Sequence, residues 1–153
     1  MKIYLAADHR GFELKEKIKK ALKKSGVSFE DLGNKIFDPN DDYPDFAIKV
    51  AKRVAQNKKN KGILICGSGA GVCIAANKVK GARAAQSFTP KHAKHLRTND
   101  NINILCLDAD WLKINTAKNI AKTFLETEFS NLARHKRRIQ KIKKIEQRWH
   151  KKV

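Results

Sequence analysis

Residues 63–71 read ILICGSGAG, an apolar run that ends in a cysteine and continues into a glycine-rich loop. A short apolar run bounded by glycine is typical of a buried strand, and the pattern after the loop is helical. Alternating glycines let the backbone approach a ligand, and the start of the next helix turns its positive end toward the same place. The stretch therefore predicts an anion-binding turn beside a thiol, with a tight strand-to-helix turn without ligand as the alternative.

Strand and helix patterns alternate on both sides of this stretch. Parallel sheets covered by helices produce such alternation, with right-handed crossovers between strands. We therefore expect an α/β fold, a three-layer Rossmann-like open parallel sheet flanked by helices with a long C-terminal helix, in a single domain over residues 1–153. Strands are expected at 3–7, 27–32, 62–66, 82–86 and 102–107, and helices at 12–24, from Pro44 to about 55, after the loop to about 77, at 90–98, around 117–125, and from Ser130 nearly to Val153.

The chain has 153 residues, enough for one core, and 34 Lys and Arg against 15 Asp and Glu give it a net charge of +19. Such a charge attracts nucleic acid, anionic membranes or phosphorylated small molecules. Much of the excess is adjacent lysine pairs, which usually mark a solvated surface, and no nucleic-acid-binding motif accompanies it. We therefore expect no specific nucleic-acid partner.

The three cysteines are odd in number and lie in apolar segments. This pattern is typical of reduced thiols in an intracellular protein and not of a disulfide framework. The start of the chain is charged, with no apolar signal region, and no apolar stretch is long enough to span a bilayer. We therefore expect a cytoplasmic protein with no membrane association.

Ligands of open parallel sheets bind where the strands end. Asp8 and His9 directly follow the first strand and should share that edge with Cys66. Amide donors and a helix start favour the ionised form of a thiol there, so Cys66 can serve as a base. The alternative is an inert core cysteine, the interpretation given to Cys73 and Cys106.

Other candidates have similar alternatives. Asp8 can cap a helix beside an exposed His9, and Tyr43 can lie over the pocket or pack in the core. Ser68 can bind a substrate oxygen or be an ordinary loop hydroxyl. Arg134 and Arg138 are one helical turn apart and can grip a phosphate together, although the rest of their helix is also basic.

Together these residues resemble the family of ribose-5-phosphate isomerase B and galactose-6-phosphate isomerase, over nearly the whole chain. The resemblance implies interconversion of an aldose phosphate and a ketose phosphate through an enediolate, without metal or organic cofactor. Ribose 5-phosphate and ribulose 5-phosphate, of the pentose phosphate pathway, are the first pair expected. The alternatives are hexose 6-phosphates of the allose or galactose type, or a sugar-phosphate-binding protein that has lost activity. The segments that carry the resemblance to this family are 7–11 (ADHRG), 42–44 (DYP), 62–71, 74–78 (IAANK), and Arg134-His135 with Arg138.

The resemblance also implies residue roles. Cys66 matches the base that moves a proton between C2 and C1, in the branch of the family that lacks a glutamate at the position of Val72. Family pockets take residues from two subunits, so a homodimer, possibly a tetramer, is expected, with the helix over about 130–153 in the subunit contact. The backbone amides of Gly67, Gly69, Ala70 and Gly71 with the Ser68 hydroxyl would hold the enediolate, Asp8 and Tyr43 would contact sugar hydroxyls, and His9, Arg134 and Arg138 would bind phosphate.

Two positions depart from the family pattern. Residues 97–101 read RTNDN where the family has Arg-x-His-Asn-Asp, so Asn99 replaces the histidine that helps to open the sugar ring, with Asp100 beside it at the substrate. His95, one helical turn earlier, is placed to reach the same space. The phosphate-binding arginine of the family's Gly-x-Arg becomes Asp110, which we expect to turn away or to pair with Arg97, Arg134 or a lysine.

Overall fold

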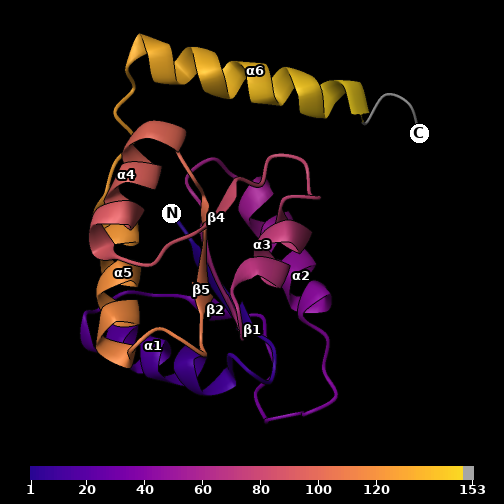
Figure 1. The fold of residues 1–153 in the computed structure, drawn as a ribbon, viewed down its shortest axis with the longest axis vertical. Coiled ribbons are helices and arrows are strands. Elements are labelled where there is room, and N and C mark those ends of the chain that lie inside the picture. Colours follow the sequence, from indigo (N-terminus) through magenta and orange to yellow (C-terminus); the bar gives the residue numbers. More distant parts are fainter. Residues whose placement is uncertain (150–153) are drawn as a thin grey trace.

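The structure is a computed structural model, and it describes residues 1–149. Strands and helices alternate along the chain until two helices end it (Figure 1). Within the described residues, no helix is long and apolar enough to cross a membrane. The elements are β1 (Ile3–Ala7), α1 (Phe12–Lys24), β2 (Glu30–Asp31), α2 (Tyr43–Ala55), β3 (Lys61–Cys66), α3 (Ala70–Ala76), β4 (Ala84–Gln86), α4 (Pro90–Asp100), β5 (Ile104–Asp108), α5 (Ile114–Glu126) and α6 (Ala133–Trp149).

The sheet has the strand order β2-β1-β3-β5-β4, and every pairing is parallel. Ile63 at the centre pairs with Leu5 of β1 and Leu105 of β5. Every residue of β1, β3 and β5 is buried, as in parallel sheets covered on both faces. Because all five strands point the same way, their last residues share one border, here called the carboxyl edge, and their first residues share the opposite one, the amino edge.

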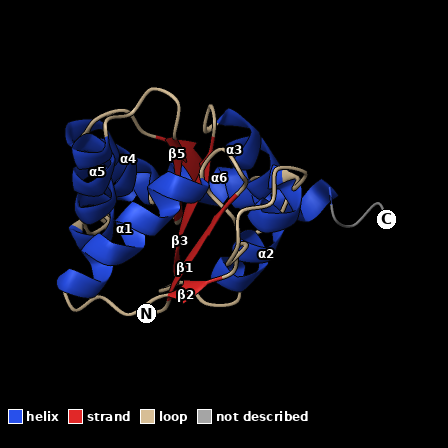
Figure 2. Ribbon diagram, turned by 90° about the horizontal axis from the view of Figure 1, so that it is seen from below, coloured by secondary structure: helices blue, strands red, loops and turns tan. Residues whose placement is uncertain are grey.

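Helices cover both faces of the sheet (Figure 2). On one side α1, α4 and α5 pack against the strands, and on the other side α2 and α3 do so. Both clusters are built from the apolar stripes that the helical periodicity predicts. The predicted fold class is therefore confirmed. The first cluster includes Leu14, Ile18, Ala93, Ile120 and Phe124, and the second includes Phe46, Val50, Val54, Val72 and Ala76.

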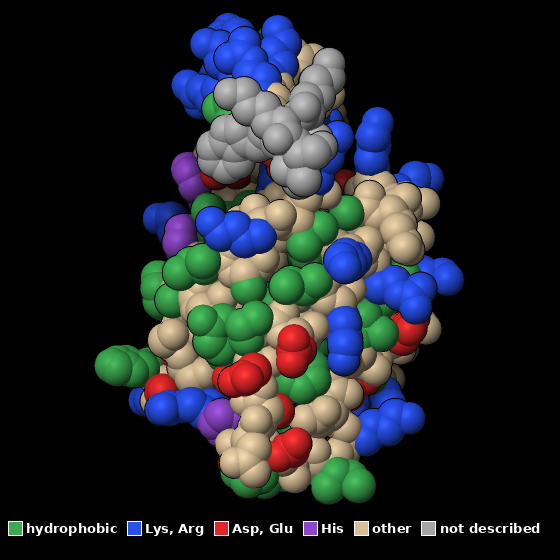
Figure 3. Space-filling model, turned by 90° about the vertical axis from the view of Figure 1, so that its right-hand side faces the viewer, with side chains coloured by type: hydrophobic (Ala, Val, Ile, Leu, Met, Phe, Trp, Pro, Cys, Tyr) green, Lys and Arg blue, Asp and Glu red, His purple; other side chains and the backbone are tan. Residues whose placement is uncertain are grey.

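The last helix, α6, crosses the amino edge of the sheet (Figure 1). Glu146 Oε1 accepts a hydrogen bond of 3.3 Å from the Gly81 amide, just before β4. Ile139 is buried, whereas Ile142 and Ile145 are about half exposed, at 48% and 49%. Lysine and arginine side chains gather at this end of the molecule, and acidic ones lie lower on the same face (Figure 3). The helix thus presents uncovered apolar side chains among basic ones, and its predicted continuation to Val153 lies outside the described residues.

Two border strands are shorter than expected, and the strand predicted at 102–107 runs over Ile104–Asp108 instead. The strand predicted at 27–32 contains only Glu30 and Asp31, because the Val27 amide donates back to the Leu22 carbonyl at the end of α1. The strand predicted at 82–86 begins at Ala84, because the Ala82 amide closes a turn on Val79. Both are border strands that pair on one side only, so local turns compete with the sheet there.

The turn from β1 into α1 depends on close backbone packing at Gly11. A Cβ at this position would lie 2.7 Å from the carbonyl oxygen of Ile65 in β3. Since the obstacle is backbone, Gly11→Ala must move α1 away from the central strand, and we expect it to lower the free energy of unfolding by about 1–3 kcal/mol. Urea denaturation measures this loss, and an unchanged midpoint would show that the turn can relax.

Candidate active site

The carboxyl edge brings together most of the residues that the sequence singles out. Asp8 and His9 follow β1, and Cys66 ends β3. The Asp8 amide donates to the Ile65 carbonyl at 3.4 Å, which continues the pairing of the two strands to this border. Tyr43 opens α2 next to the loop after β3. One edge therefore carries a thiol, a carboxylate, an imidazole and a phenol.

Cys66 is 3% exposed and lies under its own loop. Its Sγ accepts a hydrogen bond of 3.2 Å from the Gly69 amide. Gly69 has a φ of +72°, a backbone conformation that favours glycine, and a Cβ there would lie 3.0 Å from the Leu107 carbonyl carbon of β5. The turn thus aims a backbone donor at the sulfur and starts α3 at Ala70.

Ser68 stands out of the same turn. Its side chain is exposed, and its Oγ accepts a bond of 3.3 Å from the Ala70 amide. Gln86 at the end of β4 donates to the Ser68 carbonyl oxygen at 2.6 Å, which fixes the backbone of the loop. The hydroxyl is therefore held at the surface of the edge, open to a ligand.

Tyr43 lies over the glycine loop and not in the core. A Cβ at Gly71 would lie 2.8 Å from ring atoms of Tyr43, so the ring rests on the first turn of α3. The side chain is still 39% exposed. The ring therefore lies at the carboxyl edge, and its contact with a sugar hydroxyl stays a prediction.

Asp8 is buried and partly engaged by the turn that follows it. Its Oδ1 accepts a hydrogen bond of 2.9 Å from the Gly11 amide, and its Oδ2 makes no hydrogen bond within residues 1–149. Burial raises the pKa of the Asp8 carboxyl above its ordinary value. Asp8 thus has a structural role through one oxygen and a second oxygen that a substrate hydroxyl can use.

His9 is oriented by Asp41, a residue that the sequence analysis did not single out. Asp41 Oδ1 accepts from the His9 amide at 2.7 Å and lies 2.9 Å from His9 Nδ1, while Asp41 Oδ2 accepts from Asn34 at 2.9 Å. The hydrogen bond to Asp41 raises the pKa of His9 above its ordinary value. The pair favours a positive imidazolium at the carboxyl edge, which suits an anionic ligand.

Replacing Asp41 should lower the pKa of His9. Asp41→Asn keeps the size of the side chain but removes the charge that stabilises the imidazolium, so the protonated form should be lost at lower pH than in the wild type. An NMR titration of the His9 ring protons measures this, with His9→Gln identifying its signal among the five histidines. An unchanged His9 titration would mean that Asp41 acts on geometry alone.

Asp110 pairs with Arg10, which corrects our expectation of Arg97, Arg134 or a lysine. Arg10 Nη2 donates to Asp110 Oδ2 at 2.6 Å, and the two side chains meet beside Gly67. Both are partly exposed, so the pair contributes little to stability. Its effect is local: Arg10 offsets the charge of a carboxylate that stands beside the glycine loop.

The remaining predicted site residues lie at the opposite border. Asn99 and Asp100 end α4 just before β5, and Arg134 and Arg138 are exposed on the first turns of α6. The Asn99 amide nitrogen lies 3.1 Å from Nε2 and 3.2 Å from Nδ1 of His95, so these two side chains do share one space. Within one chain, the structure does not bring this group to Cys66.

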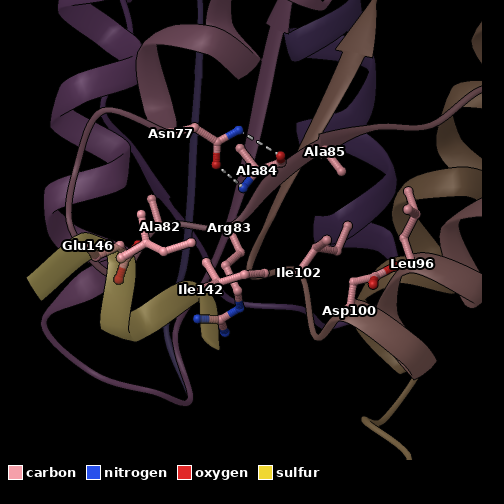
Figure 4. Close-up of a pocket in the computed structure, with 11 residues that line it drawn as sticks. Asn77, Ala82, Arg83, Ala84, Ala85, Leu96, Asp100, Ile102, Ile142 and Glu146 are labelled. Carbon is pink, nitrogen blue, oxygen red and sulfur yellow. Dashed lines mark hydrogen bonds between the residues drawn. The ribbon is translucent and has the colours of Figure 1, made fainter. Parts of the chain in front are cut away.

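A cavity of about 470 Å³ also lies at the amino edge, between β4, α4 and α6 (Figure 4). Its walls are mainly apolar, with Asp100 and Arg83 among the lining residues. Asn77 closes one side by bonding both the amide and the carbonyl of Ala84, each at 2.9 Å. The cavity contains none of the thiol, imidazole or glycine-loop groups of the carboxyl edge.

Cys73 behaves differently from the core residue that we expected. It is half-buried on α3, and its Sγ lies 3.3 Å from the Ala84 carbonyl. Its hydrogen bond with Cys106 lowers the pKa of the Cys73 thiol to about 7, while burial raises the pKa of Cys106. Both side chains belong to the packing between α3 and the sheet.

Among the described residues, no group of three His, Cys, Asp or Glu side chains is placed to hold a metal ion.

Known proteins are similar to this chain in both sequence and fold. Residues 3–142 match the model of the ribose/galactose isomerase family. The probable ribose-5-phosphate isomerase B of Mycoplasma genitalium is 47% identical over 145 residues, which cover 94% of this chain and 95% of that protein. The crystal structure of the M. genitalium isomerase with bound ribulose 5-phosphate superposes with a TM-score of 0.91 at 46% identity, covering 95% of this chain and 96% of that one. The ribose-5-phosphate isomerase B of Clostridium thermocellum gives 0.90 at 40% identity, covering 97% and 99%.

An open parallel sheet with a thiol, an imidazole and a glycine turn at its carboxyl edge is the arrangement in which Rossmann-like proteins bind small molecules. The chain belongs to the ribose/galactose isomerase family, since the family model and the relatives both span most of its length. It is accordingly an enzyme of the aldose–ketose isomerase type.

Proposed function

We propose that this enzyme interconverts ribose 5-phosphate and ribulose 5-phosphate, with Cys66 as the base. The observation that carries the proposal is the Cys66 sulfur under the Gly69 amide, beside Asp8 and His9, in a chain 46% identical to an isomerase crystallised with ribulose 5-phosphate. The substrate of the relative supports the choice of sugar. The position of the thiol supports the choice of base.

The proposed chemistry moves one proton between adjacent carbons. Cys66, as a thiolate, removes the proton from C2 of the open-chain aldose, and the electron pair forms an enediolate with its charge on O1. Backbone amides from Gly67 to Gly71 and the Ser68 hydroxyl stabilise that oxygen. Return of the proton to C1, with transfer of the O2 proton to O1, gives the ketose. No atom is gained or lost, so the reaction requires no co-substrate.

The phosphate is proposed to bind where cations from two chains converge. His9, whose protonated form is favoured by the hydrogen bond to Asp41, supplies one cation in the chain that contributes Cys66. Arg134 and Arg138 lie at the opposite border of the sheet, so a second copy must deliver them, together with Asn99 and Asp100. The half-exposed Ile142 and Ile145 of α6 give the basic helix an apolar surface to bury against that copy. A homodimer with shared pockets follows.

Removal of the proposed base tests the reaction. We expect purified wild type to convert ribose 5-phosphate to ribulose 5-phosphate, and Cys66→Ala to lose about 10²- to 10⁴-fold in kcat because that is the usual contribution of a general base. Cys73→Ala is the matched control, since its thiol lies in the packing of α3, and it should keep wild-type kcat.

Other outcomes identify other functions. Conversion of allose 6-phosphate or galactose 6-phosphate in preference to ribose 5-phosphate would replace the proposed substrate but keep the base. Tight binding of these sugars without turnover would contradict the enzyme and indicate a binding protein. Equal kcat for Cys66→Ala and wild type would contradict the assignment of Cys66 as the base, and it would leave the proposed reaction unchanged.

Mixing two inactive variants tests the shared pocket. One chain carries Cys66→Ala and the other Arg134→Ala with Arg138→Ala. In a mixed dimer one pocket receives both defects and the other receives neither. Co-expression in equal amounts should therefore restore about a quarter of wild-type activity, because half of randomly assembled dimers are mixed and each has one intact site. Arg137→Ala, also exposed on α6 but off the face of Arg134, is the control and should stay active alone. Activity that stays at the level of the separate variants would place each pocket within a single chain.

A further inference from the structure

A second basic site lies at the amino edge, away from Cys66. A cavity of about 620 Å³ is lined by the start of the chain, the connection from α2 to β3, the end of α4 and the connection from α5 to α6. Its charged lining side chains are four cations, Lys58, Lys59, Lys61 and Arg97, and one carboxylate, Glu128. The cavity is therefore strongly positive before any ligand is considered.

Two of these cations are buried without a close ion pair, although Glu128 lines the same cavity. Lys61 and Arg97 are each 5% exposed. Within residues 1–149, no carboxylate oxygen lies within 4.0 Å of either side chain. Charged groups removed from water are costly unless they are paired, so this arrangement lacks the usual compensation.

Capping of α5 accounts for only part of their bonding. Lys61 Nζ donates to the Leu125 carbonyl at 2.7 Å, and Arg97 Nε donates to the Thr127 carbonyl at 3.2 Å. Both contacts place positive charge at the negative end of the helix. An ammonium group has three donors and a guanidinium has five. Two donors of Lys61 and the Nη2 group of Arg97 make no hydrogen bond within the described part of the chain.

The charge of Arg97 acts on the pKa of Lys61. Burial, together with the charge of Arg97, lowers the pKa of Lys61 to about 8, with Glu128 opposing the shift. At neutral pH the ammonium is thus still charged but in an unfavourable setting. An anion in the cavity would relieve both the desolvation and the repulsion between the two cations.

We infer that this cavity is a binding site for a small phosphate-bearing anion, a phosphate ester or a diphosphate. Lys61 and Arg97 would donate to the phosphate oxygens from the cavity floor, and the exposed Lys58 and Lys59 would add positive charge at the mouth. A phosphate group offers several acceptor oxygens and up to two charges, which matches several convergent donors better than a single carboxylate does. The volume exceeds that of one phosphate group, and the half-buried Phe129 lines the remaining space, so an organic portion can be accommodated.

Titration calorimetry with sodium pyrophosphate at constant ionic strength tests this site. Lys58→Ala with Lys59→Ala should weaken binding several-fold, whereas Lys23→Ala with Lys24→Ala should leave it unchanged. The second pair removes the same charge from exposed positions at the end of α1, which do not line the cavity. Lys61→Met, which keeps side-chain length without charge, should weaken binding at least tenfold.

The proposed pocket at the carboxyl edge also binds phosphate, so every titration is repeated in His9→Ala. The component that depends on Lys58, Lys59 and Lys61 should persist there. Equal pyrophosphate affinity in wild type and in both cavity variants would overturn the site, as would equal weakening by the Lys23 and Lys24 pair. If Lys61→Met fails to fold, the comparison of the two lysine pairs decides. Turnover of ribose 5-phosphate is not part of the readout, so this inference stands or falls separately from the proposed function.

Discussion

The pairing of β3 with β1 on one side and β5 on the other is the constraint on which this molecule depends. It buries all three strands and gives them one direction, so the residues after each strand must meet. Asp8, Cys66 and Asp108 are neighbours for that reason alone, although about 40 to 60 residues separate them along the chain. Two close backbone contacts complete the edge: Gly11 lies against β3, and Gly69 lies against the end of β5 at Leu107 and Asp108. Side-chain chemistry at the edge is therefore set by strand length and turn geometry.

The two borders of the sheet are electrostatically different. At the carboxyl edge, cations are matched by carboxylates: His9 by Asp41, and Arg10 by Asp110. At the amino edge, Lys61 and Arg97 are held by backbone carbonyls and have no carboxylate within 4.0 Å in residues 1–149. The net charge of +19 is thus not spread evenly, and only part of it is solvated lysine. The net charge calculated from composition does not reveal this difference between the two edges, because it counts charged residues without their partners.

The spacing of apolar residues predicted the class of fold and most element bounds, because buried strands and amphipathic helices each have a characteristic spacing of apolar residues along the sequence. The bounds failed at β2 and β4, where turns compete with one-sided pairing. Of the candidate site, the glycine turn, Asp8, His9 and Tyr43 were placed together correctly. Asp41 and Arg10 were missed because their partners lie 32 and 100 residues away. The lowered pKa of Cys73 was missed for a similar reason, since it arises from the Cys106 thiol on β5, 33 residues away in the sequence.

Asn99 and the two arginines stand at one end of the strands, and Cys66 stands at the other. In the proposed dimer each sheet therefore extends from one pocket to the other. Its carboxyl edge forms one pocket, and its amino edge helps to close the second. Close-packed interiors transmit displacement with little loss. In such an assembly one packed sheet would join the two pockets, so neither pocket could change shape in isolation.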